Sequence, residues 1–180
     1  MLESLLPQAY LIGLIVLLAG AAVVVARQIL RVRRDEVALS RFDGNGNKPS
    51  DAAGLYELAS VQLRKRLYGQ ALDNLKLAAK RAESQGEPAE ARALIQNALG
   101  FALAAQNNYK TATKHYRLAL AAKPDYPVAL NNLAFALEKQ QNFEEAQALY
   151  TQVLNLEAGN KTARKRLKLL QRRGGFDAAA

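Results

Sequence analysis

Two asparagine–phenylalanine pairs carry the clearest potential for chemistry in this sequence. Asn97 is followed four residues later by Phe101, and Asn131 is followed by Phe135 at the same spacing. Residues four apart lie on one face of a helix, one turn from each other. An asparagine side chain offers both a donor and an acceptor to the backbone of an extended peptide, and a phenylalanine ring supplies apolar area for an anchoring side chain. The pairs therefore predict recognition of a peptide.

Each pair belongs to a longer stripe that we expect to face a groove. The stripes, one on each of three predicted helices, are Leu94, Asn97, Phe101 and Ala104; Val128, Asn131, Phe135 and Glu138; and Ala53, Tyr56, Ser60 and Leu63. The candidate partner-binding residues drawn from them are Tyr56, Asn97, Phe101, Asn131, Phe135 and Glu138. An alternative interpretation is that both phenylalanines pack between neighbouring structural repeats, in which case the asparagines are merely solvated.

Residues suited to catalysis or metal binding are sparse. The sequence contains no cysteine, which excludes disulfides, thiolate metal sites and thiol catalysis. Its only histidine, His115, precedes Tyr116 on a predicted helix, where a lone histidine is typical of a surface or rim position. No phosphate-binding loop, nucleophile–base pair or carboxylate pair occurs in a supporting context. We therefore predict that the protein is not an enzyme and uses no metal or cofactor.

The two asparagine–phenylalanine pairs are 34 residues apart because the sequence around them repeats with this period. The aligned positions are Leu99–Leu103 with Leu133–Leu137, Asn108–Tyr109 with Asn142–Phe143, and Tyr116 with Tyr150. This period and this spacing of small and aromatic residues are identified as the tetratricopeptide repeat, a helix–turn–helix unit. One such unit cannot bury its apolar face alone, so stacked copies form a solenoid with a concave binding surface.

The sequence predicts an all-α chain: an N-terminal transmembrane helix, a solenoid of three tetratricopeptide repeats and a C-terminal capping helix. The expected ranges are 1–41 for the anchor and juxtamembrane helix, 42–51 for a linker, 52–85, 93–126 and 127–160 for the repeats, 161–173 for a basic capping helix and 174–180 for a disordered tail. The first repeat is degenerate and is displaced by seven extra residues, which we expect to lengthen the helices and the turn between repeats one and two.

An uncharged segment near the N-terminus predicts the membrane anchor. Residues 4–26 carry no charge, and about 20 helical residues cross a hydrocarbon core of roughly 30 Å. A cleaved signal peptide is the competing interpretation, but Glu3 and the absence of Lys or Arg before the apolar run disfavour it. Arginines follow the run at once, so the positive-inside rule places the repeats on the cytoplasmic or stromal side. These arginines are Arg27, Arg31, Arg33 and Arg34.

Charge is unevenly distributed along the predicted solenoid. The net charge is +9, the second repeat is basic, the third is acidic and the capping segment is basic. The basic patch of the capping segment comprises Arg164, Lys165, Arg166 and Lys168. It could bind acidic protein, anionic lipid or RNA, but it lacks the aromatic residues that stack on bases, so we expect no specific nucleic acid. A solvated capping face is the favoured interpretation.

The layout of the chain resembles a known family. The resemblance lies in four segments: Ser4–Pro7, the exit Arg27–Arg34, Asn97–Gly100 and Val128–Leu133. These are similar to the cyanobacterial and plastid tetratricopeptide proteins that assist photosystem I assembly. The resemblance implies a single-pass scaffold in the thylakoid, or an inner, membrane that holds subunits of a membrane complex, with photosystem I suspected.

Other functions stay open. Tetratricopeptide domains that capture the carboxyl tails of chaperones need Lys or Arg at stripe sites that here hold Tyr56, Ser60, Val128 and Asn131, so tail capture is disfavoured. A general membrane-tethered adaptor for another complex is the main alternative, and an RNA or translation factor acting through the basic patch is a weaker one. The sequence leaves the oligomeric state open.

Overall fold

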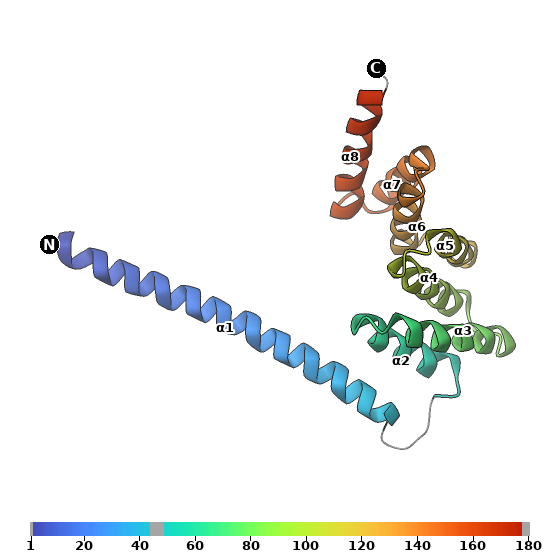
Figure 1. Ribbon diagram of the computed structural model, residues 1–180, viewed down its shortest axis with the longest axis horizontal. Coiled ribbons are helices and arrows are strands. Elements are labelled where there is room, and N and C mark those ends of the chain that lie inside the picture. The colour runs from blue at the N-terminus through green and yellow to red at the C-terminus, as the bar shows by residue number, and fades with distance from the viewer. Residues whose placement is uncertain (1, 44–48, 178–180) are drawn as a thin grey trace. The chain divides into compact units, whose positions relative to one another are not determined.

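The computed structural model describes residues 2–43 and 49–177, and all regular secondary structure in these ranges is α-helical. The helices are α1 (Leu2–Asp43), α2 (Ala52–Arg64), α3 (Tyr68–Ser84), α4 (Ala89–Ala105), α5 (Tyr109–Ala122), α6 (Pro127–Lys139), α7 (Phe143–Leu156) and α8 (Lys161–Asp177) (Figure 1). The predicted all-α class is confirmed. The chain divides into two compact units, Met1–Asn47 and Lys48–Ala180, and each is described by itself.

The N-terminal unit is built on the single helix α1. Its segment Tyr10–Leu30 is long and apolar enough to cross a membrane, and its side chains are exposed throughout. At 1.5 Å per residue these 21 residues span about 31 Å. The helix continues through Asp43, two residues into the range expected to be linker, because the first helix-breaking residue after the apolar run is Gly44. Residues 44–48 of the expected linker and 178–180 of the expected tail lie outside the described residues. Residues 174–177, expected to belong to a disordered tail, instead continue α8 to Asp177, so the predicted end of this helix at residue 173 is wrong.

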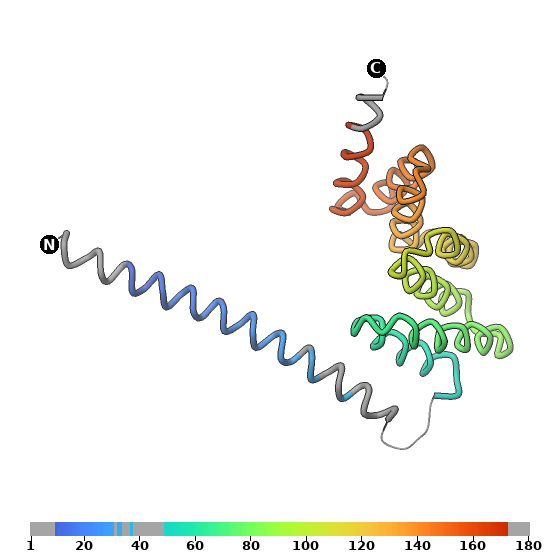
Figure 2. The backbone as a smooth tube through the Cα atoms, in the orientation of Figure 1, coloured from blue at the N-terminus to red at the C-terminus, as the bar shows by residue number. Residues whose placement is uncertain are grey.

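The second unit is an array of helix pairs that pack in sequence order: α2 with α3, α4 with α5, and α6 with α7, followed by α8 on α7 (Figure 2). Successive pairs are rotated relative to one another. The first helices of the pairs, α2, α4 and α6, also contact each other directly. An array whose first helices approach one another curves toward them, so these three helices line its inner, concave face.

Small residues allow the helices of each pair to approach closely. Ala71, Ala112 and Ala146 are fully buried, each at the same place on the second helix of its pair. The rings of Tyr116 and Tyr150, on the second helices of their pairs, are also fully buried in the hydrophobic core. Burial raises the pKa of both tyrosines well above its usual range, so both hydroxyls stay protonated.

The turn inside each pair has the same geometry. Arg66, Asn107 and Gln141 adopt a left-handed conformation, with φ of 61°, 62° and 64°. In each turn the next residue donates its N–H to the carbonyl five residues earlier, at 2.9–3.0 Å, as in the Schellman motif that ends many helices. The turns occur at equivalent positions, so the period seen in the sequence corresponds to a repeated backbone geometry.

The seven extra residues before the second repeat lie entirely in helices. Helix α3 has 17 residues against 14 in α5, and α4 has 17 against 13 in α6. The connections from α3 to α4 and from α5 to α6 have equal length. The expectation of a longer turn between repeats one and two is therefore wrong. Both helices extend because Pro88 and Gly86, which could break them, stand together in the short connection.

Candidate functional site

The first helices position the predicted groove residues on the concave side. Tyr56 lies on α2, Asn97 and Phe101 on α4, and Asn131 and Phe135 on α6. Tyr56, the two asparagines and Phe135 are half-buried, whereas Phe101 is 44% exposed. A half-buried row with one exposed ring is suited to a surface that contacts another chain.

Asn97 connects two repeats through hydrogen bonds. Asn132 Nδ2 donates to Asn97 Oδ1 at 2.9 Å, and Asn97 Nδ2 in turn donates to Tyr126 Oη at 3.5 Å. Burial and the proximity of Tyr56 raise the pKa of Tyr126, while the hydrogen bond with Asn97 acts in the opposite direction. Tyr56, Asn97, Tyr126 and Asn132, which we call the inter-repeat cluster, therefore join elements of all three repeats. The sequence interpretation missed Tyr126 and Asn132.

Asn131, at the position equivalent to Asn97, has a different environment. Its Oδ1 is buried and accepts no hydrogen bond from any residue that the structure describes. A buried amide oxygen without a donor costs about 1–3 kcal/mol relative to a satisfied one. The Asn131 amide thus retains hydrogen-bonding capacity that Asn97 has already used within the fold.

The two phenylalanines are also unequal. The Phe135 ring packs edge-to-face against Tyr109 at a centroid distance of 6.3 Å. Lys139 Nζ and the Arg166 guanidinium both lie over this ring, at 5.4 and 4.8 Å from its centroid. Cations at these distances are attracted by the face of the ring. Phe135 is therefore largely engaged by its own chain, and Phe101 is the more exposed of the two rings.

Glu138 and Arg166 form an ion pair that joins the predicted groove to the predicted basic patch. Arg166 Nη1 donates to Glu138 Oε1 at 3.1 Å, and Tyr150 Oη donates to Glu138 Oε2 at 3.3 Å. The other three basic residues of the patch are exposed, and Arg164 Nη2 donates to the Ala158 carbonyl at 2.6 Å. Arg166 thus belongs to the concave side, whereas the sequence interpretation placed it among solvated cations.

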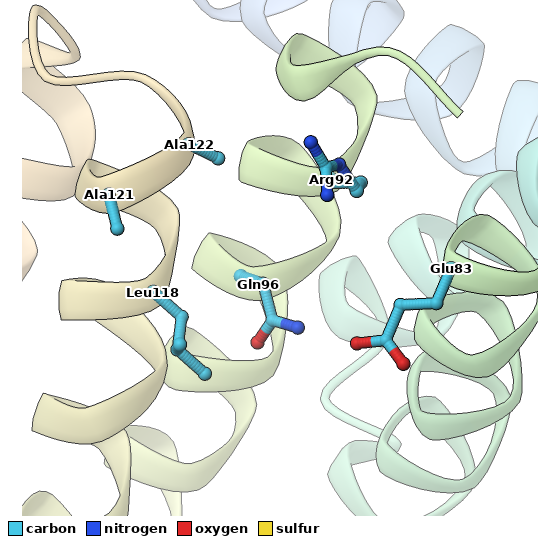
Figure 3. A pocket seen from close by; sticks show the side chains of 6 residues that line it. All are labelled: Glu83, Arg92, Gln96, Leu118, Ala121 and Ala122. Carbon is cyan, nitrogen blue, oxygen red and sulfur yellow. The ribbon is translucent and has the colours of Figure 1, made fainter. Parts of the chain in front are cut away.

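Described residues of the repeat unit line at least two hollows. One, of about 270 Å³, lies between α3, α4 and α5, and Figure 3 shows Arg92 and Gln96 of α4 between Glu83 of α3 and residues of α5. The other, of about 490 Å³, lies along α8. The residues lining the α8 hollow are Lys161, Thr162, Lys165, Arg166 and Leu169.

His115 lies next to the first of these hollows. Its Nδ1 is 2.8 Å from Gln96 Oε1, and burial together with the nearby Lys76 ammonium lowers the pKa of the imidazole. In the described ranges no three His, Cys, Asp or Glu side chains are grouped so that they could hold a metal ion. The His115 imidazole therefore has a structural partner, Gln96.

Comparison with known proteins agrees with the architecture. A family model described as "Tetratricopeptide repeat" matches residues 103–171. The tetratricopeptide domain of Sgt2 from Aspergillus fumigatus has a similar fold, with a TM-score of 0.63, 17% identity, and coverage of 72% of this chain and 82% of that one. Domains of this fold are typically scaffolds for protein interactions.

Two relatives match nearly the whole chain. The tetratricopeptide repeat domain-containing protein PYG7, chloroplastic, of Arabidopsis thaliana is 29% identical over 167 residues, which cover 92% of this chain and 54% of that longer protein. The uncharacterized protein ycf37 of Guillardia theta is 32% identical over 170 residues, 94% of each sequence. The chain therefore belongs to the ycf37 family of tetratricopeptide-repeat proteins.

Proposed function

We propose that the protein is a membrane-anchored scaffold that binds protein subunits of photosystem I during its assembly. The observation that carries the binding role is the concave row of α2, α4 and α6, on which the exposed ring of Phe101 stands beside polar groups of neighbouring repeats. An exposed aromatic ring surrounded by half-buried polar side chains is typical of an anchoring position in protein interfaces.

The membrane role rests on α1. Its Tyr10–Leu30 segment has the length and composition of a spanning helix. Arg27 and Arg33, which are exposed near the C-terminal end of this segment, favour an orientation with the repeat unit on the stromal or cytoplasmic side. In a photosynthetic membrane this would be the side on which the repeats meet subunits before their incorporation.

The assignment to photosystem I rests on similarity to related proteins. The chain resembles the photosystem I assembly family in its anchor and repeat layout, and the matching Arabidopsis protein is named as chloroplastic. Deleting the gene should lower the amount of photosystem I relative to photosystem II, measured as P700 absorbance against variable chlorophyll fluorescence. Equal loss of both photosystems, or of neither, would contradict the assignment while leaving the scaffold intact.

The groove can be tested with a matched pair of exposed apolar residues. Phe101→Ala removes the ring from the concave face, whereas Leu118→Ala removes a side chain of similar exposure, 53%, from α5 on another face. Tagged full-length variants are purified from solubilised membranes, and the co-isolated proteins are quantified by mass spectrometry. Phe101→Ala should lose them and Leu118→Ala should keep them. If both variants retain their partners, the concave face is not the binding surface.

A further inference from the structure

Helix α8 occupies the place of the first helix of a fourth repeat. It begins at Lys161, 34 residues after α6 begins at Pro127, and it packs on α7 as α6 packs on α5. Its buried residues Ala163 and Leu170 stand one period after Ala129 and Ala136, which are buried on α6. Figure 1 shows α8 beside α7 at the end of the array. The capping helix is thus also half of a repeat.

This register continues the concave stripe beyond α6. The residues of α8 one period after Val128, Asn131, Phe135 and Glu138 are Thr162, Lys165, Leu169 and Arg172. All four are exposed. The hollow of about 490 Å³ is lined by three residues of this stripe, Thr162, Lys165 and Leu169, and by the neighbouring Lys161 and Arg166. The groove therefore does not stop at the third repeat, but has a further row on α8.

The additional row is cationic. Neither Lys161 nor Lys165 has an ion-pair partner among the residues that the structure describes. Arg166 is paired with Glu138, which is the only acidic residue of the predicted groove set, so that carboxylate cannot also neutralise the lysines. Leu169, 46% exposed, adds an apolar contact beside them.

We propose that this cationic row receives an acidic segment of the partner protein whose apolar residue is anchored at Phe101. The inference rests on the proposed function, since it assumes that the concave face binds a partner. Charge complementarity selects the acidic segment, and opposite charges would also steer the partner toward this end of the groove.

The geometry sets the spacing within the segment. Packed helices lie about 8–10 Å apart. Helix α4 contacts α6, and Arg166 of α8 contacts Glu138 of α6, so the α8 row is two such steps from the α4 row. The two rows are therefore about 16–20 Å apart. An extended chain covers about 3.3 Å per residue. The partner segment should therefore carry its acidic residues about five or six positions from an aromatic or aliphatic residue.

The location of the lysines favours a peptide over a membrane or RNA. Lys165 lies on the stripe that continues the groove and Lys161 lines the same hollow, whereas Arg164 and Lys168 are exposed elsewhere on α8. Among the described residues that line the α8 hollow there is no aromatic ring, as base stacking would need. Anionic headgroups and RNA are therefore alternative outcomes of the test.

The first experiment compares two charge reversals on the same helix in the tagged full-length protein from solubilised membranes. Lys161→Glu with Lys165→Glu alters the groove row, and Arg164→Glu with Lys168→Glu is the matched control, with the same spacing and charge change. We expect the first pair to reduce recovery of co-isolated subunits by about tenfold and the control pair by less than about twofold. Lys161→Gln with Lys165→Gln serves as a milder variant, and circular dichroism checks folding.

The second experiment identifies what lies against α8. A photo-crosslinker is introduced as Leu169→p-benzoylphenylalanine, and the captured species is sequenced. A captured peptide with acidic residues at the stated spacing from an apolar residue supports the proposal. A captured lipid, nucleic acid or peptide without acidic residues would overturn it.

The failures of the two proposals are distinguishable. If Phe101→Ala loses the partners while the Lys161 and Lys165 reversals keep them, the groove binds but the α8 row is not used. If neither changes recovery, the concave face itself is not the site, and the proposed function fails with it.

Discussion

The ring of Tyr116 lies directly against the backbone of Gly100. A Cβ atom at Gly100 would be 2.5 Å from Tyr116 Cε1, and this tyrosine is almost fully buried, so the ring cannot move aside. In the third repeat the equivalent pair is Ala134 and Tyr150, where a Cβ is accommodated. The same repeat position thus accommodates a Cβ atom in the third repeat but not in the second.

Gly100→Ala should therefore destabilise the protein by about 1–3 kcal/mol, because overpacking outweighs the smaller gain in helix propensity. Gly69→Ala is the control. Gly69 lies on α3, and a Cβ added there would meet no atom within 4 Å, so alanine should stabilise the fold by about 0.5–1 kcal/mol. Urea unfolding followed by circular dichroism measures both changes. Equal stabilities of the two variants would mean that Tyr116 does not constrain Gly100.

His115 makes stability depend on pH. Its pKa in the folded state is lowered from the ordinary value of 6.5 by burial and by the charge of Lys76. Between the lowered and the ordinary pKa the unfolded chain binds more protons than the folded chain, so the free energy of unfolding falls as the pH decreases below about 6.5.

The sequence contains only one histidine, so a single substitution isolates the effect. Denaturant unfolding at a series of pH values between about 7 and 5 should show this decrease in wild type and a flatter profile in His115→Gln. Identical slopes for both proteins would show that the imidazole is not held neutral by its surroundings.

At the scale of residues, the helical period predicted which side chains share a helix face but not the contacts between them. The helical period placed Asn97 and Asn131 on equivalent faces, since that depends only on spacing. The bond from Asn132 to Asn97 and that from Asn97 to Tyr126 depend on how one repeat is rotated against the next. One usable signal was present, because Asn132 stands where the second repeat has Ala98.

At the scale of elements, α8 is attached by an ion pair as well as by apolar packing. The side chains of Arg166 and Glu138 are 35% and 16% exposed, whereas those of a second ion pair, Arg117 and Glu145, are 57% and 39% exposed. Screening by water weakens an exposed pair more than a half-buried one. The two pairs therefore allow the coupling free energy of a half-buried ion pair to be compared with that of an exposed one in the same protein.

Double-mutant cycles should give a coupling free energy of about 1 kcal/mol for Arg166 with Glu138 and below about 0.5 kcal/mol for Arg117 with Glu145. Each cycle uses the Gln substitutions of both partners, measured by thermal unfolding. The Arg166 cation over the ring of Phe135 adds to the cost of its single substitution but should cancel in the cycle. A larger coupling for the exposed pair would contradict the assigned geometry.

The helices themselves were predictable because their signals are local. The turns at Asn108 and Asn142 follow from the period, and the cores follow from the small residues at fixed positions. The sequence interpretation nevertheless treated 161–173 only as a cap. Cations at stripe positions, Lys165 and Arg172, resemble a solvated face, and this charge obscured the register that relates α8 to α6.

At the scale of the whole molecule, the proposed function requires two physically different parts: an apolar helix that retains the protein at a membrane, and a repeat unit that binds. Each part was predictable from sequence because an uninterrupted apolar run and a 34-residue period are both visible without tertiary information. The division of the chain at residues 47 and 48 follows this change of pattern. The two activities should accordingly be separable by mutation.

Leu17→Arg with Val24→Arg tests the anchor alone. Both residues are exposed on the apolar segment of α1, and each arginine near the centre of a spanning helix costs about 2.5–3.5 kcal/mol on insertion scales. The double variant should move from the carbonate-resistant membrane pellet to the soluble fraction.

The control, Leu118→Arg, changes an exposed apolar residue of the repeat unit and should stay in the pellet. The released variant should also keep the thermal unfolding midpoint of the repeat unit, because the residues of both of its core clusters lie between Ala52 and Leu170. Retention of the double variant in the pellet would mean that a surface other than α1 holds the protein at the membrane.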